Sequence, residues 1–158
     1  MQFLVESPVG PLGVVVDGET VVGVRFGAPA SFGQPGSHPA LAELAAYFAG
    51  TLTAFSVPVE LRGGSDFERA VWDQIATIPY GEMRTYGDIA TAVGDPSLAR
   101  AVGTACNHNP VPVIVPCHRV VGAGGKMVGF GGGIDRKRRL LEHEARVALE
   151  RTWGSTRD

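Results

Sequence analysis

The dipeptide Asp17-Gly18, set between two runs rich in β-branched residues, restricts the fold more than any other feature. The runs cover residues 12–16 and 20–26, and a two-residue Asp-Gly connection between such runs is a strong signal for an antiparallel hairpin. A third run at residues 2–6 can add a strand to the same sheet. The N-terminal part is therefore expected to contain a small antiparallel sheet.

A helix and one more strand are expected to complete this N-terminal part. Apolar residues recur at helical spacing over residues 40–49, and Gly50 supplies a stop signal. Residues 55–61 have the pattern of a strand, which Pro58 confines to a sheet edge because proline cannot donate to a ladder. We expect residues 1–62 to form an α/β scaffold domain without chemistry of its own.

Helical signals dominate after the linker Arg62-Gly63-Gly64-Ser65. Asp66 is expected to cap a helix that reaches residue 78, and Thr85 to cap a second helix. Asp95-Pro96-Ser97 then begins a third. Two short helices joined by such a turn resemble a helix-turn-helix. The chain as a whole is predicted to be α+β.

Charge is unevenly distributed along the chain. The net charge of −2 does not suggest a nucleic-acid partner, but residues 96–139 hold seven basic residues and one acid, Asp135, a net charge of +6. A local field of this sign attracts a polyanion, although a basic face in solvent is an alternative. Within this stretch Ala99, Ala101 and Gly103 leave the third helix nearly bare. Its backbone could therefore closely approach DNA or a neighbouring helix.

Membrane and secreted classes are disfavoured. No apolar run reaches the roughly 20 residues of a transmembrane helix. The first six residues lack the basic start and apolar block of a signal peptide, and two cysteines do not make a disulfide framework. We expect a soluble cytoplasmic protein with no membrane association.

Cys117-His118-Arg119 interrupts an apolar stretch, residues 111–121, that is expected to be extended. Cysteine reacts as its thiolate, and neighbours such as His118 and Arg119 can lower the pKa of the thiol. On a strand, adjacent side chains point to opposite faces. A proton relay between Cys117 and His118 would then need a bridging water.

Two other chemistries stay open for these residues. A cysteine hydrolase would need a histidine held against the thiol by an orienting amide or acid. A metal site would have unusual spacing for zinc, and its candidate ligands are Cys106, His108, Cys117 and His118.

A series of motifs follows along residues 66–145. They are Pro79-Tyr80-Gly81-Glu82, Thr85-Tyr86, Arg100-Ala101-Val102-Gly103, Asn109-Pro110-Val111-Pro112, Pro116-Cys117-His118-Arg119-Val120-Val121, Gly129-Phe130-Gly131-Gly132-Gly133 and Leu140-Leu141-Glu142-His143-Glu144. In content and order they resemble the O6-alkylguanine-DNA alkyltransferase family. The resemblance implies a winged-helix-like DNA-binding domain over residues 66–150 that carries the active-site cysteine.

The resemblance also implies a reaction: irreversible, single-turnover transfer of an alkyl group from O6-alkylguanine, with O4-alkylthymine as a second candidate, to a protein cysteine. Cys117 would be the acceptor and His118 its water-relayed base. Glu144 would orient His118, and Asn109 would brace the turn that presents the thiol. Tyr86 would donate a proton to the leaving base.

The implied partner is double-stranded DNA with a flipped base. Arg100 would fill the gap left in the duplex. The other implied DNA-facing residues are Thr85, Ala99, Ala101, Gly103 and Arg119, and the implied pocket residues are Val128, Phe130 and Gly131. Many members of the family carry Tyr at position 130, and several carry Ser at position 131, so hydroxyl contacts to the base are missing here.

No cofactor and no metal are expected, and the protein is expected to act as a monomer that could bind DNA cooperatively. Two other functions are compatible with parts of this pattern. An alkyltransferase-like protein that only flags lesions would lack the acceptor, whereas Cys117 is present. A helix-turn-helix regulator could instead use Cys117 as a methyl-responsive switch.

Overall fold

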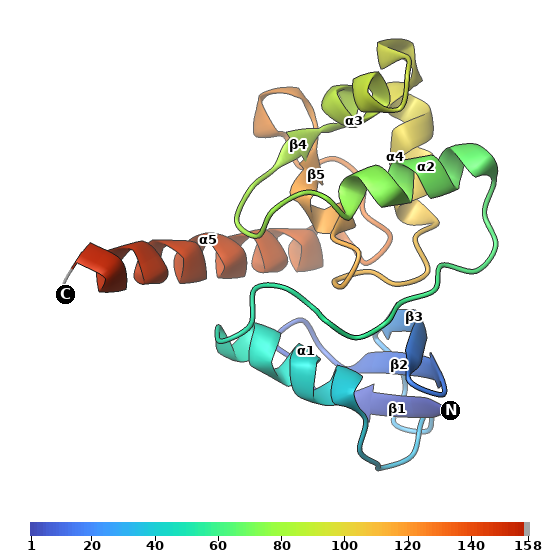
Figure 1. The fold of residues 1–158 in the computed structure, drawn as a ribbon, viewed down its shortest axis with the longest axis vertical. Helices are drawn as coiled ribbons and strands as arrows, with labels where there is room; N and C mark the ends of the chain where they lie inside the picture. Colours follow the sequence, from blue (N-terminus) through green and yellow to red (C-terminus); the bar gives the residue numbers. More distant parts are fainter. Residues whose placement is uncertain (157–158) are drawn as a thin grey trace.

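The N-terminal part is built on the hairpin that the sequence predicts. The computed structural model describes residues 1–156. Strands β1 (Gln2–Val5), β2 (Leu12–Asp17) and β3 (Thr20–Phe26) form an antiparallel sheet in the order β1-β2-β3 (Figure 1). Asp17 pairs with Thr20 across the turn, and Gly18 has a φ of 60°. The predicted hairpin and third strand are confirmed.

Helix α1 (Pro39–Ala49) follows the sheet and ends at Gly50, which has a φ of 82°. The expected strand over residues 55–61 is wrong, because only Val59 pairs with the sheet, in an isolated bridge to Val21. Pro58 explains the difference: its carbonyl accepts a bond from the Val21 amide at 2.8 Å, but it has no N–H with which to extend a ladder.

Three helices begin the second part, and local sequence supplies side-chain caps for the first two. Helix α2 spans Asp66–Ile75, α3 spans Tyr86–Ala92 and α4 spans Ala99–Asn107 after a short 3₁₀ turn at Pro96–Leu98. Thr85 caps α3 as predicted. Asp66 is not the cap of α2: Ser65 and Glu68 form a reciprocal capping box there.

Helix α2 ends at Ile75, three residues earlier than expected. The amides of Thr77 and Ile78 bond to carbonyls three residues back, so the chain leaves the helix in tight turns. Trp72 of α2 donates a bond of 2.8 Å to the carbonyl of Ala105 in α4. This bond joins α2 to α4 at a position where Ala105 is fully buried.

The apolar stretch 111–121 is not the extended segment expected. Cys117–Arg119 forms a 3₁₀ turn, and only Val120–Val121 is a strand, β5, parallel to β4 (Arg84–Thr85). Three prolines between positions 110 and 116 remove amide donors. Val113 also has a φ of 73°, in the left-handed region that branched side chains seldom adopt.

Helix α5 (Ile134–Thr156) follows a third 3₁₀ turn at Ala123–Gly125 and continues past residue 150. Figure 1 shows it between the sheet-containing part and the helical part. One cluster of buried apolar residues includes side chains from both parts, so α5 packs into a shared core. Within residues 1–156, no helix combines the length and apolarity that a membrane span requires.

Candidate active site

The sulfur of Cys117 is held in a short turn at the end of the proline-rich loop. The residue is only 2% exposed. Asn109 donates through Nδ2 to Cys117 Sγ at 3.1 Å and to the carbonyl of Val115 at 2.9 Å, while its Oδ1 accepts from the amide of Val111 at 2.9 Å. Asn109 therefore contacts both ends of the turn that holds the thiol, the position that the predicted bracing role requires.

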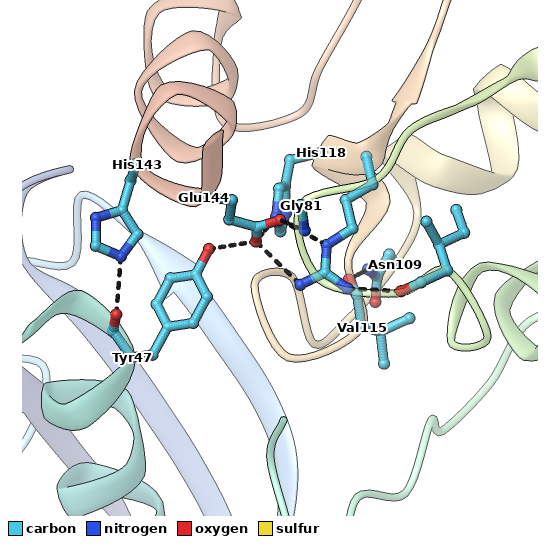
Figure 2. A network of polar contacts seen from close by, with 9 residues as sticks. Tyr47, Gly81, Asn109, Val115, His118, His143 and Glu144 are labelled. Atoms are coloured by element: carbon cyan, nitrogen blue, oxygen red, sulfur yellow. Dashed lines mark hydrogen bonds and ion pairs between the residues drawn. The ribbon is translucent and has the colours of Figure 1, made fainter. Parts of the chain in front are cut away.

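His118 and Glu144 are both buried and meet across the core. His118 Nε2 lies 2.7 Å from Glu144 Oε2, whereas His118 Nδ1 has no partner among the described protein groups. Glu144 also accepts bonds from the Gly81 amide at 3.3 Å and from Tyr47 Oη at 2.6 Å (Figure 2). The contact places Glu144 where the predicted orienting role would need it, and that role stays a prediction.

Arg119 lies inside the protein, and the expected contact with DNA is wrong. Its Nε and Nη2 donate to the two oxygens of Glu144 at 2.8 and 3.0 Å, and its Nη1 donates to the carbonyl of Ile78 at 2.7 Å. The residue is 7% exposed. A buried guanidinium paired to a carboxylate cannot at the same time reach a phosphate on the surface.

The electrostatics of this network favour a neutral imidazole. Burial alone would raise the pKa of Glu144, but the hydrogen bonds from His118 and Arg119 and the charge of Arg119 outweigh it and hold this pKa far below its usual value. Burial lowers the pKa of His118, against the opposing effect of Glu144. A neutral His118 that donates from Nε2 leaves Nδ1 as an acceptor. It can therefore act as a base.

The thiol of Cys117 is protonated in the resting protein. A hydrogen bond with Cys106 and burial raise its pKa, while the amide of Asn109 and the charge of Lys137 act in the opposite direction. Because the thiolate is the reactive form, the proton must leave as the sulfur reacts. The expectation that Cys117 and His118 point to opposite faces of a strand does not apply, because both residues belong to the 3₁₀ turn.

Tyr86 is paired with a buried lysine. Its hydroxyl donates to the carbonyl of Val128 at 3.0 Å and accepts from Lys137 Nζ at 3.2 Å. Burial, followed by the thiols of Cys106 and Cys117, raises the pKa of Tyr86 to about 12. The phenol is thus protonated at neutral pH, as a proton donor must be.

A cavity of about 400 Å³ opens at the sulfur of Cys117, and Phe130 and Gly131 line it as predicted. A Cβ built on Gly131 would lie 3.5 Å from the backbone oxygen of Asn107, an ordinary contact. Val128 does not line this cavity. It lies instead in a neighbouring cleft of about 600 Å³, and Asn107 belongs to both hollows.

The neighbouring cleft is lined by the start of α3, by one side of α4 from Ala99 to Asn107, and by the segment 122–129. Of the residues predicted to face DNA, Thr85, Ala99, Arg100 and Gly103 line this cleft together with Tyr86, whereas Ala101 does not. Not all basic residues of the stretch 96–139 are on the surface. Arg119 and Lys137 are buried, so the count of seven basic residues overstates the charge available to a partner.

Comparisons with known proteins agree with this geometry. A family model described as the 6-O-methylguanine DNA methyltransferase DNA-binding domain matches residues 66–146. A methylated-DNA–protein-cysteine methyltransferase of Mycobacterium tuberculosis is 49% identical over 148 residues, which cover 89% of each chain. The chain belongs to the 6-O-methylguanine DNA methyltransferase family.

Solved structures of this methyltransferase family extend the likeness to the whole fold. The crystal structure of the Mycobacterium tuberculosis O6-methylguanine methyltransferase has 48% identity, a TM-score of 0.83 and a match over 92% of both chains. A structure of that bacterium's protein in complex with DNA gives a TM-score of 0.85 at 49% identity, over 91% of this chain and 92% of the other. The predicted fold class and family resemblance are confirmed.

Two residues of this methyltransferase site were missed from the sequence. Lys137 was counted as surface charge, although it shares a helical face with Leu140 and Glu144, and that periodicity could have shown that it is buried. Tyr47 carried no local signal. Its polar partner, Glu144, is 97 residues away in sequence.

The metal-site alternative finds no support in the geometry. In the part of the chain that the structure describes, no group of three or more His, Cys, Asp or Glu side chains converges in a way that could hold a metal ion. Cys106 and Cys117 are free thiols.

Proposed function

We propose that this chain repairs O6-alkylguanine in duplex DNA by transferring the alkyl group to Cys117, once per molecule. The observation that carries the proposal is that Cys117 lines a cavity and is followed in sequence by His118, which is buried against Glu144, in a chain of this family. The cavity adjoins a cleft that is lined by Arg100 and other residues of helix α4.

The reaction is a displacement at the alkyl carbon. Cys117 Sγ forms a bond to that carbon while the bond from the carbon to guanine O6 breaks. The thiol proton passes through a water molecule to Nδ1 of neutral His118, and Tyr86 gives a proton to the leaving guanine. Lys137 lies 3.2 Å from the Tyr86 oxygen and stabilises the phenolate that remains. The product is a thioether, which neither water nor ordinary thiols reverse.

The target base must leave the duplex, because O6 inside a base pair is beyond the reach of a buried thiol. Unstacking costs a few kcal/mol. The small residues Ala99 and Gly103 let the start of α4 come close to the duplex, and the planar guanidinium of Arg100 can occupy the place of the flipped base. Phe130 offers a ring against which the base can stack.

Intact-protein mass spectrometry tests the proposal. Incubation with a duplex that contains one O6-methylguanine should add the mass of one CH₂ to wild type, mapped to the Cys117 peptide. Cys117→Ser should show no addition, and Cys106→Ser should react like wild type. A parallel duplex with O4-methylthymine tests the second substrate. Lesion binding without any mass gain would contradict transfer and favour the lesion-flagging alternative; methylation of Cys106 would overturn the choice of acceptor.

A further inference from the structure

The N-terminal part contributes one polar side chain to the active-site network. Tyr47 belongs to α1, is fully buried, and donates from Oη to Glu144 Oε2 at 2.6 Å (Figure 2). The same oxygen lies 2.7 Å from His118 Nε2 and accepts from Arg119 Nη2 at 3.0 Å. Tyr47 and His118 therefore share one acceptor atom.

Tyr47 is itself fixed in position. His143, next to Glu144 on α5, donates from Nε2 to the backbone carbonyl of Tyr47 at 2.8 Å. The Tyr47 ring stacks on Phe55 with centroids 5.5 Å apart and meets Tyr80 edge-on at 6.0 Å. Because these contacts fix the ring, the hydroxyl is held facing Glu144, and its bond to Glu144 is part of a rigid arrangement.

We infer that Tyr47 is a positioning residue for the transfer reaction, acting through Glu144 on His118. The inference rests on the proposed function. A hydroxyl that donates to Oε2 fixes the carboxylate and withdraws electron density from the oxygen that His118 uses. A weaker acceptor stabilises the imidazolium less, so the ring stays neutral at lower pH. The N-terminal part would then tune the base instead of serving only as scaffold.

Few charged and titratable groups surround His118 and Tyr47. His118 is influenced by Glu144 and Lys137 from α5 and by Arg119 beside it in sequence. The environment of Tyr47 adds Tyr80 and His143. Loss of the Tyr47 hydroxyl changes none of these charges, so its effect on His118 must act through the hydrogen bond to Glu144.

Tyr47→Phe is the decisive variant, and Tyr80→Phe is its matched control. The Tyr80 ring lies 5.5 Å from the Arg119 guanidinium, yet its buried hydroxyl has no hydrogen-bond partner among residues 1–156. Both changes remove one phenolic oxygen beside the same network. The measurements are the single-turnover rate of methyl transfer between about pH 5 and 9 and the affinity for lesion-containing duplex.

Tyr47→Phe should lower the rate at neutral pH by about tenfold and move the acidic limb of the pH profile to higher pH, with unchanged DNA affinity. Tyr80→Phe should match wild type in all three. A merely structural Tyr47 would reduce thermal stability without moving the acidic limb. An unmoved limb, or an equal shift in Tyr80→Phe, would overturn the inference.

A titration that needs no methyl transfer separates this inference from the proposed function. The His118 ring resonances, followed by NMR against pH in DNA-free protein, should titrate at higher pH in Tyr47→Phe than in wild type and Tyr80→Phe. If wild type transfers no methyl group while this shift is present, the proposed function fails and the coupling of Tyr47 to His118 stands. Identical titration in all three proteins would refute the coupling.

Discussion

At the residue scale, the sulfur of Cys117 is subject to opposing influences. Cys106 and burial raise the pKa of the thiol, and Asn109 and Lys137 lower it, with the raising effects larger. A protonated, 2% exposed thiol reacts slowly with chance electrophiles. This arrangement suits the proposed single use of the cysteine, because in that mechanism the sulfur becomes a good nucleophile only when His118 can take its proton.

Cys106→Ala tests that account. Removal of the hydrogen bond to Cys106 should lower the pKa of Cys117, and each unit of decrease raises the thiolate fraction near neutral pH about tenfold. Alkylation of Cys117 by iodoacetamide at pH 7, followed by peptide mass spectrometry, should therefore be several-fold faster than in wild type. Cys106→Ser, which keeps a hydrogen-bonding group, should lie in between. A slower reaction in Cys106→Ala would contradict the assignment.

Gly131→Ser probes the cavity at the same sulfur. The added Cβ fits at 3.5 Å from the Asn107 backbone oxygen, and the hydroxyl can donate to a bound base, a bond that contributes about 0.5–1.5 kcal/mol. The side chain also takes space beside the O6 substituent. We expect the ratio of the rates for O6-benzylguanine and O6-methylguanine to fall. An unchanged ratio would mean that Gly131 does not set the width of the cavity.

At the element scale, turns and helix caps that depend on adjacent residues could be predicted from the sequence. Structure that depends on contacts with residues far away in the chain could not. Asp17-Gly18 and Thr85 act through adjacent backbone, and both did what the sequence indicated. The stretch 111–121 looked extended because its side chains are apolar and branched, but Asn109 and three prolines fold it into turns. The candidate site came from motifs, whereas the burial of Arg119 depends on Glu144 in another helix.

Helix α4 provides the prediction at this scale. Arg100 is exposed at its first turn and lines the cleft, with the small residues Ala99 and Gly103 beside it. Arg100→Ala should impair repair of duplex DNA at least tenfold and leave the reaction with free O6-benzylguanine base within about twofold of wild type, because the free base needs no flipping. Arg138→Ala, which removes an exposed arginine from α5, serves as the control. Equal losses on both substrates would place Arg100 in the reaction pocket.

At the scale of the whole molecule, one carboxylate joins segments that lie far apart in the chain. Glu144 on α5 accepts from Tyr47 of α1, from the Gly81 amide between α2 and β4, and from His118 and Arg119 in the 3₁₀ turn. The carboxylate that we propose orients His118 therefore also links the two parts of the fold. Stability and reactivity should respond together to its protonation.

Acid unfolding tests this tie. The pKa of Glu144 in the folded protein lies far below its usual value of 4.5, so its contribution to stability is complete above that value and is lost as pH falls below it. Glu144→Gln should lower the free energy of unfolding at pH 7 by about 3–5 kcal/mol, because Arg119 is left buried without its partner. The difference from wild type, measured by urea unfolding from pH 7 to pH 3, should narrow below about pH 4.5, because the unfolded wild type then binds a proton on Glu144 that the folded protein does not bind. Asp135→Asn, at a carboxylate of α5 whose side chain is 90% exposed, should match wild type throughout. A gap for Glu144→Gln that stays constant with pH would show that shape, and not the charge of Glu144, holds the two parts together.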